Sequence, residues 1–128
     1  TFTANENGDP EQIVHSREEL GIQLTYKDYR GTEDANAKAN QFIDEDWEQP
    51  FDLEKGPLLR FNLLQVADEH YIFYYNMHHI ISDGWSMQVL SNDILAAYKA
   101  ISENNSQEKE VYWLVILFTS YYIIYCET

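Results

Sequence analysis

Two adjacent histidines and an aspartate–glycine pair are the residues of this sequence best suited to chemistry. His78 and His79 are followed, after three residues, by Asp83 and Gly84. An imidazole titrates near neutral pH, so it can accept a proton from an attacking amine or hydroxyl, or hold that nucleophile by a hydrogen bond. The spacing therefore offers a histidine able to act on a nucleophile, with a carboxylate one tight turn away.

The residues before the histidines predict where their side chains point. Residues 71–79 are apolar for most of their length, which is typical of a buried central strand, and we expect His79 to lie at its end. Because side chains alternate along a strand, the two imidazoles should face opposite sides, and only one should reach a given pocket. His79 would share a row with Phe73, Tyr75 and Met77, and His78 with Ile72, Tyr74 and Asn76.

Asp83 and Gly84 have several roles open to them. Asp83 is expected to be buried behind the turn, where it could hold the turn by an ion pair or backbone hydrogen bonds, or cap a helix that begins near Trp85. Gly84 allows a positive φ or a close approach of the backbone to a ligand. Arg60 could reach Asp83, but we prefer a cross-strand or surface pairing for it. A metal site at His79 and Asp83 would need a further ligand from elsewhere in the fold.

Hydrophobic spacing indicates the elements that position these residues. An amphipathic helix is expected from Thr32 until Pro50 stops it, and an apolar stripe from Met87 to Ile101 predicts a second helix that packs on the sheet. The strands are expected at residues 12–15, 22–26, 58–66 and 71–79, and the last two form a hairpin around a polar break. These elements predict an α/β fold.

Other polar residues offer weaker sites. His15 and His70 lie in surface-like contexts, and we expect no catalytic role for them. Ser82 and Ser86 lack the Gly-x-Ser-x-Gly context of a hydrolase nucleophile. The pair of histidines therefore stays the leading candidate for chemistry, although adjacent histidines at a strand end are more often structural than catalytic.

Composition excludes some functions. Eight basic and 22 acidic residues give a net charge of −14, which would repel a phosphate backbone, so no nucleic-acid partner is expected. Cys126 is the lone cysteine and can form neither an internal disulfide nor a cysteine-based zinc site, which favours a reducing, cytoplasmic setting. The first residue is Thr1 rather than methionine, and we expect the chain to be cut from a longer protein.

The end of the chain differs from the rest. Residues 102–110 are polar and are interpreted as a linker, and residues 111–126 form an apolar and aromatic run. As a helix this run would fall a little short of a normal membrane span, at about 1.5 Å per residue, and a membrane role is not expected. A buried strand or strand pair is preferred, and a read-through or frame-shifted end stays open. We expect its deletion to leave the hairpin and the second helix intact.

The histidine region resembles a known family. Residues 77–86 read MHHIISDGWS and closely resemble the active-site motif of nonribosomal peptide synthetase condensation domains of the amide-forming type. Residues 50–60 resemble the segment that precedes the central hairpin of that family, and Thr1 and Phe2 resemble the end of an upstream motif. Residues 1–106 are therefore interpreted as a partial condensation domain from the N-terminal lobe. Residues 107–128 are interpreted as an atypical apolar tail that need not be native to the domain.

The resemblance implies a fold and a set of roles. The fold would be an incomplete chloramphenicol-acetyltransferase-like α/β lobe, a mixed sheet flanked by helices, with the active site in a tunnel beside a second lobe. His79 would be the catalytic residue. His78, Asp83 and Gly84 would be supporting or structural: Asp83 pairs in the family with an upstream arginine that this chain lacks, and the Gly84 backbone lies close to the thioester. No metal and no directly bound cofactor is implied.

The same resemblance implies partners. Donor and acceptor peptidyl carrier proteins would deliver substrates on their phosphopantetheine arms, next to adjacent synthetase domains. The reaction would be amide bond formation between an acyl donor and an aminoacyl acceptor, and the isolated fragment is expected to be inactive. Two alternatives stay open. The first is a related acyltransferase that uses the same His79 but forms esters or takes an untethered acceptor. The second is a non-catalytic remnant or interaction fragment.

Overall fold

The structure, a computed structural model, describes residues 1–104, 112–117 and 121–127. Its strands are β1 (Phe2–Ala4), β2 (Pro10–Gln12), β3 (Leu24–Asp28), β4 (Leu59–Ala67), β5 (His70–Met77), β6 (Tyr112–Leu117) and β7 (Tyr121–Glu127). Its helices are α1 (Arg17–Leu20), α2 (Ala35–Glu48) and α3 (Gly84–Asn104), and η1 is a 3₁₀ turn at His79–Ile81.

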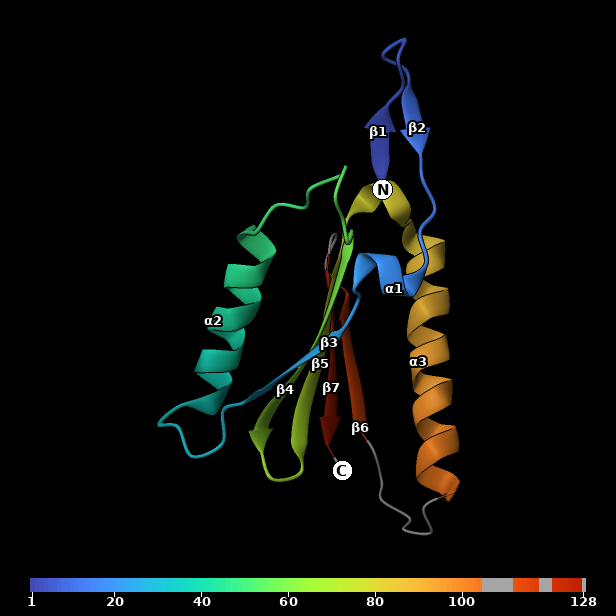
Figure 1. The fold of residues 1–128 in the computed structure, drawn as a ribbon. Helices are drawn as coiled ribbons and strands as arrows, with labels where there is room; N and C mark the ends of the chain where they lie inside the picture. The colour runs from blue at the N-terminus through green and yellow to red at the C-terminus, as the bar shows by residue number, and fades with distance from the viewer. Residues whose placement is uncertain (105–111, 118–120, 128) are drawn as a thin grey trace.

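A mixed sheet forms the middle layer of the molecule. Its five strands lie in the order β3-β4-β5-β7-β6, with β3 parallel to β4 and the other neighbours antiparallel. Figure 1 shows α2 on one side of this sheet and α3 on the other, with the β1–β2 ribbon beyond one end. The predicted α/β architecture, a mixed sheet flanked by helices, is confirmed.

The core lies on both faces of β5. On one face Ile72 and Tyr74 pack with Ala39 of α2, and on the other Tyr75 packs with Met87 of α3. All five side chains are buried. The prediction of a central strand covered on both sides is therefore confirmed, and so is the alternation that sends Tyr74 and Tyr75 to opposite faces.

Local signals fix the ends of α2. The side chain of Asp34 accepts a hydrogen bond of 2.9 Å from the backbone N–H of Ala37, which satisfies one of the free donors of the first turn. The helix ends at Glu48, and Gln49 is already extended because it precedes Pro50, which disfavours a helical conformation at the residue before it. The predicted helix is confirmed, with a start slightly later than Thr32.

The first predicted strand was misplaced. β2 pairs with β1 and ends at Gln12, so residues 13–15 lie outside it. Ile13 still exchanges two backbone hydrogen bonds of 2.9 Å with Thr1, but the ribbon does not continue beyond that pair. The ring of His15 instead contacts the hydroxyl of Thr1 at 2.7 Å. The predicted strand at residues 22–26 exists as β3 and extends to Asp28.

The apolar end of the chain forms two strands. β7 pairs antiparallel with β5, and β6 pairs with β7 at the edge of the sheet, so the preferred strand-pair prediction is confirmed. Within the described residues no helix is both long and apolar enough to cross a bilayer. α3 extends to Asn104, and the rest of the predicted linker at 102–110 lies outside the described residues. Because β7 pairs with one edge of β5, deletion of the tail would expose that edge.

Candidate active site

The two histidines follow the central strand rather than end it. β5 stops at Met77, His78 is extended (φ −67°, ψ 134°), and His79 begins η1. The backbone N–H of His78 donates to Leu58 at 3.0 Å, and the chain then turns, with Ile81 donating to the carbonyl of His78 at 3.1 Å. The expectation that His79 lies at the strand end is wrong, because after the cross-strand bond of His78 the turn hydrogen bonds of Ile81 and Ser82 replace the sheet ladder.

The ring of His78 stabilises the turn. Its Nδ1 accepts a hydrogen bond of 3.0 Å from the backbone N–H of Ile80, so the proton of the neutral ring lies on Nε2. The same ring meets Phe51 edge-on, with ring centroids 5.9 Å apart and an interplanar angle of 90°. These two contacts fix both the plane and the tautomer of His78.

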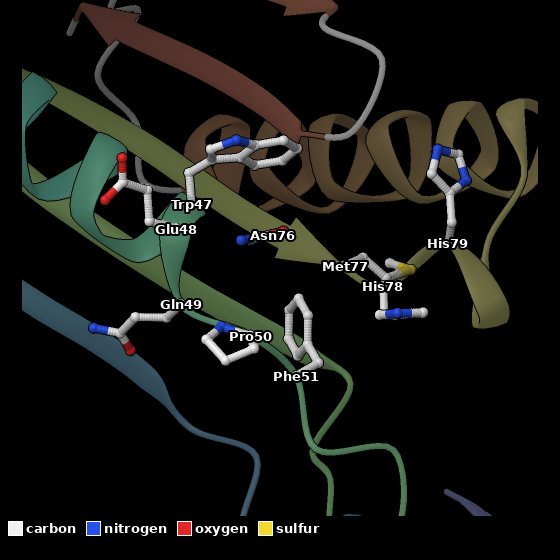
Figure 2. Close-up of a pocket in the computed structure, with 9 residues that line it drawn as sticks. All are labelled: Trp47, Glu48, Gln49, Pro50, Phe51, Asn76, Met77, His78 and His79. Carbon is white, nitrogen blue, oxygen red and sulfur yellow. The ribbon is translucent and has the colours of Figure 1, made fainter.

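An open pocket of about 370 Å³ lies beside both histidines. Its volume is within the range of about 300–1,000 Å³ typical of small-molecule sites. Figure 2 shows the two imidazoles pointing in different directions, with His78 next to Phe51 and His79 away from it. The lining residues are Trp47, Glu48, Gln49, Pro50, Phe51, Asn76, Met77, His78 and His79.

The two imidazoles diverge, although both residues are among those that line the pocket. This divergence is not continued strand alternation, since β5 ends at Met77, one residue before the pair. The inference that only one of the two imidazoles reaches the pocket stays a prediction. Among the described residues, no three His, Cys, Asp or Glu side chains gather closely enough to hold a metal ion.

Asp83 caps α3. Its Oδ1 accepts a hydrogen bond of 2.8 Å from the backbone N–H of Ser86, while the Ser86 hydroxyl lies 2.8 Å from the backbone nitrogen of Asp83. The hydrogen bonds from the Ser86 backbone and hydroxyl lower the pKa of Asp83 because they stabilise its charged form. The capping alternative is confirmed, but the carboxylate is exposed rather than buried.

Gly84 is the first residue of α3, and its φ does not lie in the left-handed region. A Cβ added at this position would meet nothing within 4 Å. The positive φ considered for Gly84 is therefore wrong, and the described residues leave its backbone open on that side. A role beside a ligand stays a prediction.

Arg60 belongs to a half-buried polar cluster on the α2 face of the sheet. Its Nε donates to the Asp46 carboxylate at 2.8 Å, so the expected cross-strand or surface pairing is wrong. The same carboxylate accepts hydrogen bonds from the hydroxyl of Tyr74 at 2.9 Å and the side-chain amide of Asn76 at 3.3 Å. Burial, and then the charge of Asp46, raise the pKa of Tyr74, so its hydroxyl stays a donor.

Sequence reasoning missed Asp46, although a signal was present. Ala39, Ile43 and Asp46 are the buried residues of α2, and their spacing of four and three places them on one helix face. A carboxylate in an apolar stripe needs a partner, because a buried charge is costly unless it is paired. The basic residue on the neighbouring hairpin, Arg60, supplies that partner.

Comparison with known proteins identifies the family. The family model described as "Condensation domain" matches residues 1–114. The chain belongs to the condensation-domain family. It is 42% identical over 106 residues to gramicidin S synthase 2 of Aneurinibacillus migulanus, and 40% identical over 106 residues to tyrocidine synthase 3 of Brevibacillus parabrevis. Each match covers 81% of this chain but 2% of the relative, so the chain spans a very small part of these proteins.

Solved structures agree with this membership. The starter condensation domain of rhizomide synthetase RzmA superposes with a TM-score of 0.69 at 26% identity, over 80% of this chain and 24% of that chain. The R148A mutant of that domain in complex with C8-CoA gives a TM-score of 0.70, again at 26% identity, over 80% of this chain and 23% of that chain. The chain thus spans about a quarter of these condensation domains, and its fold is the corresponding part of theirs.

Proposed function

We propose that this chain is part of an amide-forming condensation domain in nonribosomal peptide synthesis, and that His79 is its catalytic residue. The observation that carries the proposal is the pocket beside the histidine turn in a chain of the condensation-domain family. Residues 1–106 form the condensation-domain part in this proposal, and residues 107–128 are an atypical tail. The relatives, which are gramicidin and tyrocidine synthases, support the same reaction class.

The proposed reaction joins two tethered substrates. The amine of an aminoacyl thioester attacks the carbonyl carbon of an acyl thioester, a C–N bond forms, and the C–S bond to the donor arm breaks. His79 accepts the proton that the amine loses, or holds the amine for attack, and the proton ends on the departing thiolate. Phosphopantetheine arms of donor and acceptor carrier proteins hold the two thioesters, and adjacent synthetase domains supply these carriers in the cytoplasm.

The other residues of the turn have supporting roles in this proposal. His78 holds the turn through the backbone N–H of Ile80, and Asp83 holds the start of α3 through Ser86. The backbone of Gly84 begins that helix, where free N–H groups carry partial positive charge and would stabilise charge on the thioester oxygen. None of these contacts requires a metal or a directly bound cofactor.

The test is substitution of each histidine in the intact domain. His79→Ala should reduce single-turnover transfer between two loaded carrier proteins by about 10²- to 10⁴-fold, the usual contribution of a positioned general base. His78→Ala should be milder and should mainly lower stability, because it removes the acceptor for the Ile80 N–H. Circular dichroism of both variants controls for folding. Near-parental transfer by a folded His79→Ala protein would refute the assignment, as would complete loss in a folded His78→Ala protein.

A further inference from the structure

Arg60 connects the end of α2 to the central hairpin. Besides its bond to the Asp46 carboxylate, its Nη2 donates to the backbone carbonyls of Asp46 at 2.7 Å and Gln49 at 3.1 Å. Carbonyls in the last turn of a helix lack partners within the helix, so an arginine that reaches them from outside fixes that end in place. The segment that leaves α2, which lines the pocket, is therefore held against β4 by the Arg60 side chain.

The same guanidinium contacts an aromatic ring that also touches the histidine turn. The guanidinium carbon of Arg60 lies 4.0 Å from the ring centroid of Phe51. The edge-on contact between Phe51 and His78 then joins this ring to the imidazole that accepts the Ile80 N–H. Both partners of Phe51 act on a ring that is only partly buried, so its orientation depends on them.

We infer that Arg60 is a positioning residue for the histidine turn, acting through Phe51 on His78. Arg60 fixes the plane of Phe51, Phe51 limits the rotation of the His78 ring, and His78 sets the geometry of the turn that begins with His79. Lysine could keep the ion pair with Asp46 but not the planar stacking and the forked bonds, because its ammonium is a point charge. The effect on transfer rests on the proposed catalytic role of His79, whereas the effect on His78 does not.

The first part of the test is spectroscopic. Arg60→Lys and Phe51→Leu are made in the intact domain that carries this chain, and the ring nitrogens of His78 are followed by NMR with ¹⁵N-labelled histidine. Both variants should shift the His78 ring signals and the amide signal of Ile80. The matched control is Arg30→Lys, because Arg30 also holds an ion pair, with Asp28, but lies on the exposed surface. That control should leave the His78 signals unchanged.

The second part is kinetic. A reacting group displaced by about 1 Å can lose about 10²-fold in rate, and a small rotation of the turn should cost less, so we expect kcat of carrier-to-carrier transfer to fall about tenfold in both variants. KM should change little for Arg60→Lys, since Arg60 does not line the pocket, whereas Phe51 does, so the Phe51→Leu variant is compared by kcat alone. If Arg60→Lys unfolds, Phe51→Leu decides the outcome, because Phe51 lies outside the helices and strands.

Unchanged His78 signals in folded Arg60→Lys and Phe51→Leu proteins would overturn the inference and would leave Arg60 only the task of holding α2. Shifted His78 signals without any loss of kcat would also overturn it, provided that His79→Ala abolishes transfer. If His79→Ala instead retains transfer, the proposed function fails by itself, and the His78 signals alone then decide whether Arg60 positions the turn.

Discussion

Removal of the Asp46 carboxylate tests whether the polar cluster stabilises the fold. The side chains of Asp46 and Arg60 are 9% and 23% exposed, so the pair lies mostly out of water. Asp46→Ala would leave the guanidinium without its counter-charge and the Tyr74 hydroxyl without its acceptor. We expect the free energy of unfolding to decrease substantially.

The magnitude follows from the burial. Loss of one partner from a buried ion pair costs about 3–5 kcal/mol, and the partial exposure of Arg60 favours the lower end of that range. Loss of the hydrogen bond that the Tyr74 hydroxyl donates to Asp46 adds about 1 kcal/mol, so we expect a total of about 4 kcal/mol for Asp46→Ala. Asp46→Asn keeps an acceptor of similar shape for Tyr74 and should cost about half as much.

Urea unfolding followed by circular dichroism measures these differences. Asp28→Ala is the control, because Asp28 makes an exposed ion pair with Arg30, and exposed pairs contribute little. In a double-mutant cycle, Asp46→Ala should lower the free energy of unfolding much less in an Arg60→Met background, since no unpaired guanidinium charge is then left buried. A loss for Asp46→Ala no greater than that for Asp28→Ala would refute the reasoning.

Three further predictions concern the start of α3 and the tail. Asp83→Asn in the intact domain should lower thermal stability and activity together, and a stable variant with a specifically lost chemical step would instead give Asp83 a direct role. Hydrogen bonds from Ser86 lower the pKa of Asp83 in the folded protein. The Asp83 carboxylate therefore stabilises the fold at a pH above its unfolded pKa, near 4, and this stabilisation is lost as the pH falls through the lower folded pKa. The melting temperatures of the parent and of Asp83→Asn should converge in acid. A protein that lacks residues 111–128 should keep its helical dichroism signal, but its molecules should associate with one another through the exposed edge of β5. A monomer in size-exclusion chromatography would contradict this.

Periodicity predicted the parts of the fold that repeat. The hairpin followed from two apolar runs around a polar break, and the assignment of Tyr74 to one face and Tyr75 to the other followed from alternation alone. The stripe from Met87 predicted α3 because the spacing of apolar residues in a helix is set by its own geometry. These features depend on residues close in sequence, so one chain was sufficient to infer them.

The sequence was less informative where contacts join distant residues. Arg60 and Asp46 are 14 positions apart and lie on different elements, so no local spacing pairs them. The end of β5 was missed because the residues at 78 and 79 are as compatible with a strand as with a turn, and turn hydrogen bonds decided between them. The exposure of Asp83 was missed for a related reason: a cap needs only the N–H groups of its own helix and no buried setting.

The contacts of His78 and Asp83 show what holds the turn of the motif. His78 Nδ1 and the Asp83 carboxylate each accept a backbone N–H, so both side chains are used to hold the chain at the two ends of the turn that contains His79. Removal of either side chain would free a backbone N–H that the turn now uses, so the backbone that carries His79 would lose one of its two anchors. This is why the proposed function gives His78 and Asp83 the task of holding the turn and leaves the contact with the amine to His79.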